Sequence, residues 1–354
     1  MERPALSMLT LPELEKKLYP FPRFHAAQIL NWTARGVSDF DQMTDIPLSL
    51  RDMLKKNFRI FSSAIVSCHD DNDAKKIVIS LKDNSKIESV LLNDGKNRFT
   101  ACLSTQAGCP IGCVFCKTGA LGFKRNLESY EIIEQFIFLR GTALNVMQKD
   151  TENSDKQEHI IDNIVIMGMG EPLLNLAQLK KAIEFFTNPA GMNFSKRRIT
   201  ISTCGICNSL FDIAQNGPYV RLALSLVTAD EILREKLMPV TKTNPLQKVK
   251  EGLILYQKKT GSRVTLEIPL LGGINTREKD ALSAADFAKG MDTVVNIIPW
   301  NPVEGLEFED KQLVEPEKRE IENFISKLES NGLKVTKRLR KGRGIMGACG
   351  QLGA

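Results

Sequence analysis

The sequence predicts an α/β protein whose core is a partial or full (β/α) barrel. Between about residues 99 and 340, apolar strand segments alternate with amphipathic segments of helical period. The six strand segments are FTACLST, NIVIMG, RRITIST, VRLALSL, VTLEIPL and TVVNIIPW. Near-continuous β-branched runs are typical of parallel strands joined by right-handed helical crossovers. A doubly wound open sheet has the same rhythm, and periodicity alone does not separate the two folds.

Two smaller elements precede this core. Apolar residues at three- and four-residue spacing predict helices in LPELEKKLY, FHAAQILNWTARG and DQMTDIPLSLRDMLKKNF. The period then shifts towards two, and KKIVISLKDNSKIESVLLNDGKN predicts a β-hairpin that turns at Asp83-Asn84. The polar stretch QKDTENSDKQE at 148–158 predicts an exposed loop inside the core. The expected division is a helical module at 1–60, a hairpin extension at 61–98, the core at 99–340 and a C-terminal loop at 341–354.

The sequence predicts no membrane-spanning helix. The chain of 354 residues is 42% hydrophobic and 25% charged, and no window approaches 18 uncharged apolar residues. The N-terminus has no basic segment leading into an apolar one, so we expect no secretory signal and a cytoplasmic location. The net charge of +6 is compatible with a polyanionic partner but does not establish one. Six cations between residues 334 and 343 form either a solvated strand or an edge that contacts phosphates.

Cysteine spacing points to metal chemistry. Three of the eight cysteines, Cys109, Cys113 and Cys116, form a C-x3-C-x2-C run after the first core strand. Three thiolates can hold three irons of a [4Fe–4S] cluster and leave the fourth iron open. That iron could chelate the amino and carboxylate groups of S-adenosylmethionine (SAM). A structural zinc ion is the alternative, but zinc takes four ligands and no fourth is nearby.

A glycine-rich turn follows the second core strand. In MGMGEPLLN, residues 167–175, the turn exposes backbone groups and one carboxylate. This arrangement suits an amine-bearing ligand better than a phosphate. The alternative interpretation is a plain glycine-rich connection.

The cysteine spacing resembles that of the radical SAM superfamily, and the turn resembles the motif that holds the methionine amino group of SAM. The whole chain, from FHAAQILNW and FDQMTDIPLSLR to GACGQL, resembles the RlmN-type adenine-C2 methyltransferases and their C8-methylating relatives of the Cfr type. This resemblance implies a partial radical SAM (β/α)6 barrel behind a helical RNA-binding module. It also implies methylation of adenosine C2 in 23S rRNA, with tRNA as a further substrate. C8 methylation stays open as the alternative.

The resemblance also implies a division of labour among three residues. Cys349 matches a cysteine that takes a methyl group from one SAM, while a second SAM yields the radical that activates it. Cys102 matches the cysteine that resolves the protein–RNA adduct, and a disulfide bond is part of the pattern. Glu88 matches the residue that accepts the proton from the base, with its register open by one position. Taken alone, Cys102 inside a strand is more typical of a buried free thiol, whereas Cys349 lies in a glycine-rich segment with little core to fill, which favours a functional role.

Further positions match SAM contacts of the family. These are Gly170, Glu171, Ser202, Ser225, Leu226, Val227 and Asn301. Val227 stands where the family often has histidine, and Arg343-Gly344 stands where acidic residues are usual. The extra pair Cys204 and Cys207 is either packing thiols or a second metal or redox site. We expect a monomer that takes electrons from a flavodoxin or ferredoxin type of donor.

Two rival functions remain at this point. Another radical SAM enzyme, such as a glycyl-radical activase, explains the cysteine run but leaves Cys102, Cys349 and the helical module without a role. A cysteine-rich RNA-binding or iron–sulfur scaffold protein would cleave no SAM.

Overall fold

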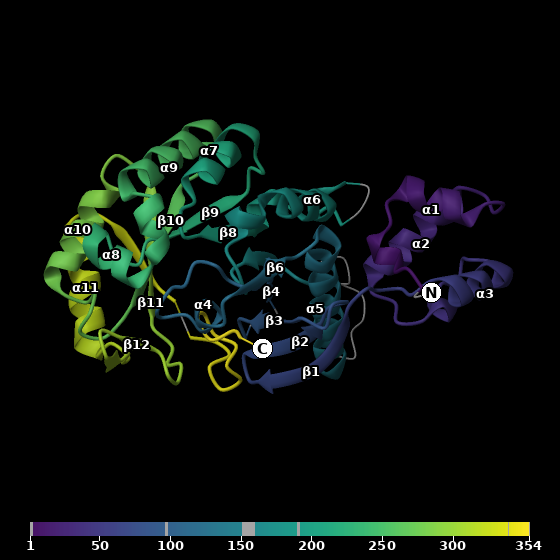
Figure 1. The fold of residues 1–354 in the computed structure, drawn as a ribbon, viewed down its shortest axis with the longest axis horizontal. Helices are drawn as coiled ribbons and strands as arrows, with labels where there is room; N and C mark the ends of the chain where they lie inside the picture. Colours follow the sequence, from purple (N-terminus) through teal and green to yellow (C-terminus); the bar gives the residue numbers. More distant parts are fainter. Residues whose placement is uncertain (1–2, 96–97, 151–159, 190–191, 339, 354) are drawn as a thin grey trace.

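The computed structural model describes residues 3–95, 98–150, 160–189, 192–338 and 340–353. Its main sheet has ten strands in the order β1-β2-β3-β4-β7-β8-β9-β10-β11-β14 (Figure 1). The strands from β4 to β14 are all parallel to their neighbours. They are β4 (Phe99–Cys102), β7 (Asn163–Ile166), β8 (Ile199–Thr203), β9 (Arg221–Ser225), β10 (Val264–Leu270), β11 (Thr293–Pro299) and β14 (Lys334–Lys337). The six predicted core strands are therefore confirmed, and the polar edge strand β14 was not expected.

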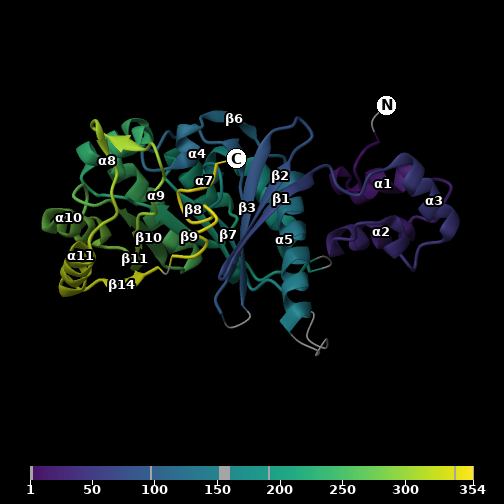
Figure 2. The same cartoon turned by 90° about the horizontal axis from the view of Figure 1, so that it is seen from below.

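The order of the parallel strands follows the chain, with no reversal. A doubly wound sheet would show a switch point in this order, so that alternative is excluded. The sheet ends at β1 and β14 without closing, and the predicted partial barrel is confirmed. Helices cover its outer side (Figures 1 and 2). They are α5 (Ser129–Asp150), α6 (Leu176–Thr187), α7 (Cys207–Asn216), α8 (Glu231–Leu237), α9 (Leu246–Thr260), α10 (Glu278–Ala288) and α11 (Lys318–Ser330).

An antiparallel extension continues the sheet beyond β4. It consists of β1 (Ala64–Asp71), β2 (Ala74–Ser80) and β3 (Lys86–Asn93). The predicted hairpin corresponds to β2 and β3, and Asn84 in its turn has a φ of 63°. Strand β1 was missed because most of its residues are exposed and carry no alternating burial pattern. β3 pairs with β4 so that Val90 lies opposite Cys102.

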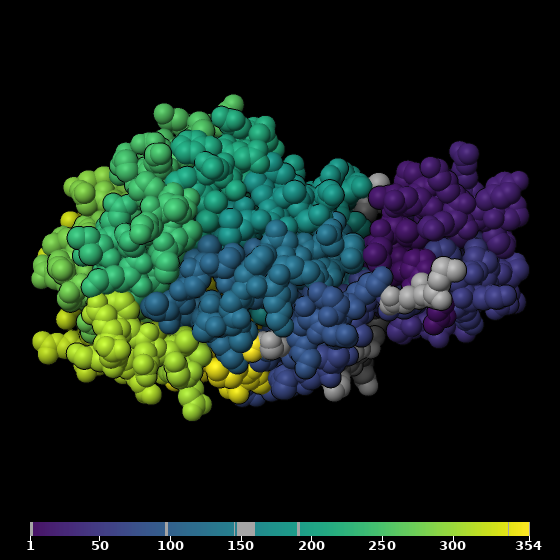
Figure 3. Space-filling model, viewed as in Figure 1, coloured from purple at the N-terminus to yellow at the C-terminus, as the bar shows by residue number. Residues whose placement is uncertain are grey.

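The N-terminal residues form a helical lobe with its own core (Figure 3). The lobe contains the short helices η1 (Leu6–Met8) and η2 (Phe40–Gln42), and α1 (Leu11–Leu18), α2 (Phe24–Arg35) and α3 (Leu48–Asn57). A single buried carboxylate joins the lobe to the barrel. Glu134 on α5 accepts hydrogen bonds from the backbone N–H groups of Ser62 at 2.7 Å and Ser63 at 2.9 Å. The Ser7 hydroxyl also donates to Glu134.

Short elements surround the carboxyl ends of the parallel strands. They are β5 (Gln106–Gly108), α4 (Lys117–Ala120), β6 (Phe123–Asn126), η3 (Pro172–Asn175), η4 (Lys196–Arg198), η5 (Pro239–Thr243), β12 (Glu307–Phe308) and β13 (Lys311–Gln312). The exception is η4, which directly precedes β8 and therefore lies at the amino ends of the strands. Most of the predicted loop at 148–158 lies outside the described residues, while α5 extends to Asp150. None of the helices in the described part of the chain is long and apolar enough to cross a membrane.

Candidate active site

Three cysteines share one loop between β5 and α4. Cys109, Cys113 and Cys116 all line a cavity of about 190 Å³, which we call the cysteine cavity. The loop needs glycine where it folds back on itself. Gly108 has a φ of 77°, and a Cβ there would lie 1.9 Å from the carbonyl oxygen of Gly122. Trp300, just after β11, donates from Nε1 to the carbonyl of Phe115 at 2.9 Å and holds the loop in place.

Burial keeps these thiols protonated in the absence of a cation. It raises the pKa of Cys109 to about 12 and raises the pKa values of Cys113 and Cys116 above the ordinary range. A bound metal reverses this because a coordinating thiol is deprotonated. Among the described residues, no three Cys, His, Asp or Glu side chains are grouped to hold a single metal ion. A [4Fe–4S] cluster distributes its ligands over separate irons, so it does not require the three thiolates to converge on one ion.

The turn after β7 reaches the same cavity with Gly170 and Glu171. The Glu171 carboxylate is buried and accepts hydrogen bonds from Thr203 Oγ1 at 2.6 Å and from the Cys204 N–H at 2.8 Å. Burial raises the pKa of Glu171, and these hydrogen bonds oppose that rise. Both carboxylate oxygens are thus occupied within the protein, so Glu171 fixes the turn. The carbonyls of Gly168 and Gly170 accept no hydrogen bond from the described residues, which leaves them for an amine-bearing ligand.

Glu267 and Arg338, which were not expected from the sequence, lie beside the predicted serines. Ser202 on β8 and Ser225 on β9 both line the cysteine cavity. Ser202 Oγ donates to Glu267 Oε2 at 2.6 Å, and Arg338 Nη1 lies 3.8 Å from Glu267 Oε1. Glu267 is a carboxylate inside the apolar strand segment VTLEIPL. A charged residue in such a segment indicates a functional position, so Glu267 could have been found from the sequence. Arg338 carried no such signal, because it stands among the other tail cations.

Leu226 and Val227 do not line the cavity. Both side chains are buried, and Val227 has a φ of 65°, which is unusual for a β-branched residue. Asn275 stabilises this bend by donating from Nδ2 to the Val227 carbonyl at 2.8 Å. Arg234 is fully buried and donates to the carbonyls of Leu226 at 2.9 Å and Cys204 at 2.7 Å. Neither Asn275 nor Arg234 was expected, and together they fix the carboxyl ends of β8 and β9.

The C-terminal segment folds back over the cysteine loop and brings Cys349 with it. The N–H of Lys117 donates to the Gly350 carbonyl at 2.8 Å, and Thr118 Oγ1 donates to the Leu352 carbonyl at 2.5 Å. Asn301 donates from Nδ2 to the Cys349 carbonyl at 3.1 Å. The other amide atom of Asn301, Oδ1, is buried and has no partner among the described residues. A ligand in the adjoining cavity can supply the missing donor.

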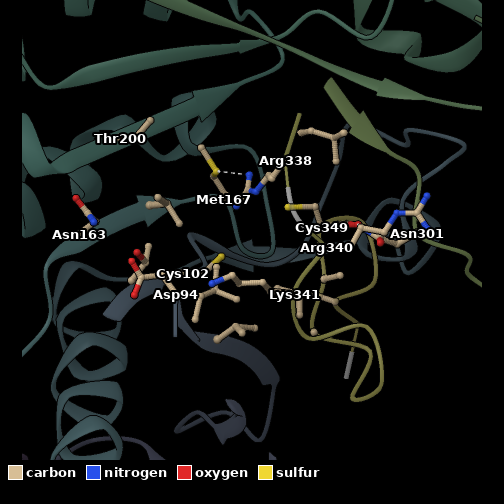
Figure 4. Close-up of a pocket in the computed structure, with 18 of the residues that line it drawn as sticks. Asp94, Cys102, Asn163, Met167, Thr200, Asn301, Arg338, Arg340, Lys341 and Cys349 are labelled. Atoms are coloured by element: carbon tan, nitrogen blue, oxygen red, sulfur yellow. Dashed lines mark hydrogen bonds between the residues drawn. The ribbon is translucent and has the colours of Figure 1, made fainter. Parts of the chain in front are cut away.

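A second cavity, of about 480 Å³, adjoins the first (Figure 4). We call it the inner cavity. Both cavities are lined by Met167, Ile298, Asn301, Arg338 and Cys349. Cys102, at the end of β4, lines the inner cavity but not the cysteine cavity. Burial and the nearby Cys349 raise the pKa of Cys102 to about 12, and Arg338 opposes the rise. The structure therefore brings the two predicted reactive cysteines to one cavity, with the Arg338 guanidinium beside them.

Glu88 lies outside both cavity linings. Its side chain is buried, with Oε1 2.9 Å from Lys76 Nζ, and Oε2 accepts a hydrogen bond from the Gly353 N–H at 2.7 Å. Its nearest link to the inner cavity is through Val90 and Leu352, which do line it. The structure thus places Glu88 beneath the C-terminal segment.

Most of the tail cations are used within the protein. Arg340 and Arg343 both pair with Glu315, and Lys341 donates to the Asn93 carbonyl. Arg338 lines the two cavities. The interpretation of this run as a continuous phosphate-contacting edge is therefore not supported. Arg340, Lys341 and Arg343 hold the C-terminal segment in place through these contacts, whereas Lys334 and Lys337 are exposed.

All eight cysteines are free, so the disulfide bond expected from the resemblance is absent from this structure. Cys204 lines the cysteine cavity, and Cys207 begins α7 with its N–H donating to Asn244 Oδ1 at 2.8 Å. Both side chains are buried. This placement favours packing thiols over a second metal site at Cys204 and Cys207.

Comparison with known proteins agrees with this geometry. Residues 103–285 match the Radical SAM superfamily, and residues 17–60 match the Ribosomal RNA large subunit methyltransferase N-terminal domain. A protein of Treponema denticola named "Probable dual-specificity RNA methyltransferase RlmN" is 45% identical over 351 residues, which are 99% of this chain and 95% of the relative. The chain belongs to the RlmN family of radical SAM RNA methyltransferases.

Other RlmN relatives and one crystal structure extend the match. A protein of the same name from Thermus thermophilus is 36% identical over 342 residues, covering 96% of this chain and 92% of the relative. The crystal structure of a radical SAM methyltransferase from Sphaerobacter thermophilus superimposes with a TM-score of 0.88 at 33% identity, over 99% of each chain. The RlmN fold is therefore shared over the full length.

Radical SAM enzymes use a [4Fe–4S] cluster and SAM, and this RlmN family member has residues that fit both. Cys109, Cys113 and Cys116 would hold the cluster through their thiolates. The unpaired Oδ1 of Asn301 and the free carbonyls of Gly168 and Gly170 would bind SAM. All these groups line the cysteine cavity.

Proposed function

We propose that this chain methylates C2 of an adenosine in 23S rRNA, and also in tRNA, with Cys349 carrying the methyl group as S-methylcysteine. One observation carries this proposal. Of the eight cysteines, all of which the structure describes, Cys349 is the one that lines both cavities. A carrier must receive its methyl group in one compartment and deliver it in the other. The relatives named dual-specificity RNA methyltransferases support two classes of RNA substrate.

The reaction uses two SAM molecules for each methyl group transferred. In the first stage Cys349 accepts a methyl group, as its S–C bond forms while the sulfonium–methyl bond of the donor breaks. The thiol proton of Cys349 passes to solvent in this stage, and the Arg338 guanidinium lies beside the sulfur. Bound cluster and SAM supply the radical chemistry of the second stage.

Cys349 and Cys102, which line the inner cavity, complete the transfer together with Glu88, which lies beneath the C-terminal segment. The methyl carbon on Cys349, after loss of one hydrogen atom, forms a bond to C2 of the base, and the adduct returns its unpaired electron to the bound cluster, so that RNA stays tethered to the protein. Glu88 accepts the C2 proton, which requires that the Gly353 N–H release its Oε2. The Cys102 thiolate then attacks the Cys349 sulfur, so that a disulfide forms as the C–S bond to RNA breaks, and the released methylene carbon takes up a proton to become the methyl group. This is the stage at which the expected disulfide belongs.

Two further requirements are RNA binding and a supply of electrons. The helical lobe at residues 1–60 binds RNA, and its match to a ribosomal RNA methyltransferase domain supports this role. A flavodoxin or ferredoxin type of protein donates the electrons. We expect the enzyme to act as a monomer in the cytoplasm.

The test is product identification. Anaerobically reconstituted enzyme is incubated with SAM, reductant and a transcript of 23S rRNA or tRNA, and digested RNA is analysed by mass spectrometry against 2-methyl- and 8-methyladenosine standards. We expect 2-methyladenosine. Cys349→Ala should give no product, and Cys102→Ala should accumulate a covalent protein–RNA adduct. Cys68→Ala is the control, because Cys68 is exposed and lines neither cavity. The 8-methyl isomer, or unmodified RNA with an intact cluster, would contradict the proposal.

A further inference from the structure

The inner cavity extends along the barrel to the amino ends of the parallel strands. Cys102, Met167, Ile298 and Asn301 line it where strands end. Its opposite part is lined by residues at strand starts, which are Thr100 on β4, Asn163 on β7, Thr200 on β8 and Arg221 on β9. Figure 4 shows Asn163 and Thr200 on the side away from Cys349 and Asn301.

The carboxyl end of the barrel is occupied by the protein itself. Enzymes of this architecture usually take their substrate there. Here the C-terminal segment is bonded to the cysteine loop through Lys117 and Thr118, and Gln351 Nε2 donates to the Pro302 carbonyl at 2.9 Å. A large substrate that must reach Cys349 therefore needs another route.

A basic hollow adjoins the inner cavity at the amino end. The hollow, of about 420 Å³, shares Thr200 and Arg221 with the inner cavity. Four exposed cations line it, and we call them the basic shelf: Lys196 and Arg197 in η4, Arg221 at the start of β9, and Arg263 just before β10. None of them forms an ion pair with another residue in the described part of the chain. Unlike the tail cations, they keep all their donors for an external anion.

The other groups at this end suit a nucleic acid. Tyr219, which is 42% exposed, also lines the hollow, and its hydroxyl donates to the Gln215 carbonyl at 2.7 Å. That bond fixes the ring and leaves a face on which a base can stack. The one carboxylate in the inner cavity lining, Asp94, pairs with Arg98. Arginine guanidinium groups form bidentate hydrogen bonds to phosphates, so the basic shelf fits a phosphodiester chain.

We propose that the RNA approaches from the amino end of the parallel strands, with its phosphates on the basic shelf and the target nucleotide inserted past Thr200 and Arg221 towards Cys349. This inference rests on the proposed RNA methylation and specifies the entry route. An acidic electron donor is the competing partner for a basic surface. An electron donor on the basic shelf is disfavoured because the cluster ligands lie at the opposite, carboxyl ends of the strands. The five residues of β8 alone separate the two ends by roughly 16 Å.

Charge removal tests the shelf. The variant Lys196→Gln/Arg197→Gln/Arg263→Gln is compared with Lys279→Gln/Lys289→Gln/Arg319→Gln, which removes three exposed cations from the region of α10 and α11. Binding of a fluorescein-labelled RNA stem–loop with an unpaired adenosine is measured against salt concentration. We expect the shelf variant to bind at least tenfold more weakly and to reduce the slope of log K against log[salt] by about two to three. The control variant should match the unmodified protein.

Two further readouts separate this inference from the proposed function. Methylation of Cys349 by SAM, measured as the mass of the C-terminal peptide, needs no RNA and should survive in the shelf variant. Its absence in the unmodified protein would overturn the proposed function and not the shelf. RNA affinity and salt slope that are unchanged in the shelf variant would overturn the shelf. Loss of reductant-driven SAM cleavage with intact RNA affinity would also overturn it, by assigning the surface to the electron donor.

Discussion

Lys76 Nζ lies 2.9 Å from Glu88 Oε1, and both side chains are buried. The two residues are diagonal neighbours, since Val78 on β2 pairs with Glu88 on β3. Because Glu88 Oε2 also accepts from the Gly353 N–H, one carboxylate links the antiparallel extension to the C-terminal segment. Lys76 was not singled out from the sequence, and it is the ion-pair partner of Glu88 at this buried position.

We predict that Lys76→Met lowers the free energy of unfolding by about 3 kcal/mol, because it leaves an uncompensated buried carboxylate. Lys76→Met/Glu88→Gln should recover part of that loss, since the remaining partner is then neutral. Urea denaturation of the anaerobic protein measures both. If the double variant were less stable than Lys76→Met, the pair would not be coupled in this way.

Asn301 should contribute both to SAM binding and to the position of the C-terminal segment. Its Nδ2 donates to the Cys349 carbonyl, and its buried Oδ1 awaits a ligand donor. We expect Asn301→Ala to weaken SAM binding and to slow Cys349 methylation by about tenfold or more, which corresponds to a lost buried hydrogen bond of about 1–3 kcal/mol. Titration calorimetry and mass spectrometry of the C-terminal peptide measure the two effects. An unchanged affinity for SAM would remove Asn301 from its binding site.

Cys102 should react slowly until the pH is high. Its pKa is raised from 9.0 to about 12 in the folded protein, first by burial and then by Cys349. At pH 8 its thiolate fraction is therefore about 1,000-fold below that of the unfolded chain, so alkylation by iodoacetamide should be slow and should rise about tenfold per pH unit up to pH 10. Peptide mass spectrometry measures the rate, with exposed Cys68 as the reference. Fast labelling of Cys102 at pH 8 would contradict the burial argument.

The same shift has a consequence for stability. Below about pH 9 the Cys102 thiol is protonated in both the folded and the unfolded state. Its full contribution to the free energy of unfolding is then present. Between pH 9 and about 12 the unfolded chain ionises first, so stability should fall as the pH rises through this window. Cys102→Ser should lose less stability over that window in urea denaturation series.

Glu134 should control the attachment of the helical lobe. Its carboxylate accepts from the N–H groups of Ser62 and Ser63, which would be buried without partners in Glu134→Ala. We expect that variant to lose about 3 kcal/mol of stability and to be cleaved by protease near residues 60–63. Glu134→Gln retains one acceptor oxygen and should be intermediate. Equal resistance of all three proteins to limited proteolysis would show that the lobe is held in another way.

Cluster assembly should distinguish the loop cysteines from their neighbour. Single alanine variants of Cys109, Cys113 and Cys116 should each lose bound iron and sulfide after anaerobic reconstitution. Cys204→Ser alters the wall of the same cavity and should retain the unmodified content. Iron and sulfide assays on the four proteins decide the matter. Loss of iron in Cys204→Ser alone would require a different ligand set.

While the strand order came from the structure, the sequence by itself determined the alternation of core strands and helices, the cysteine loop and the family. Each of these depends on local spacing: a strand and its helix adjoin along the chain, and three ligands fall within eight residues. Local spacing says nothing about which distant side chains converge. Only the tertiary structure placed Arg338 beside Cys102 and Cys349, paired Arg340 and Arg343 with Glu315, and put Glu88 beneath Gly353. Such contacts join residues up to 265 positions apart, and they are set by how the strands and the returning C-terminal segment pack.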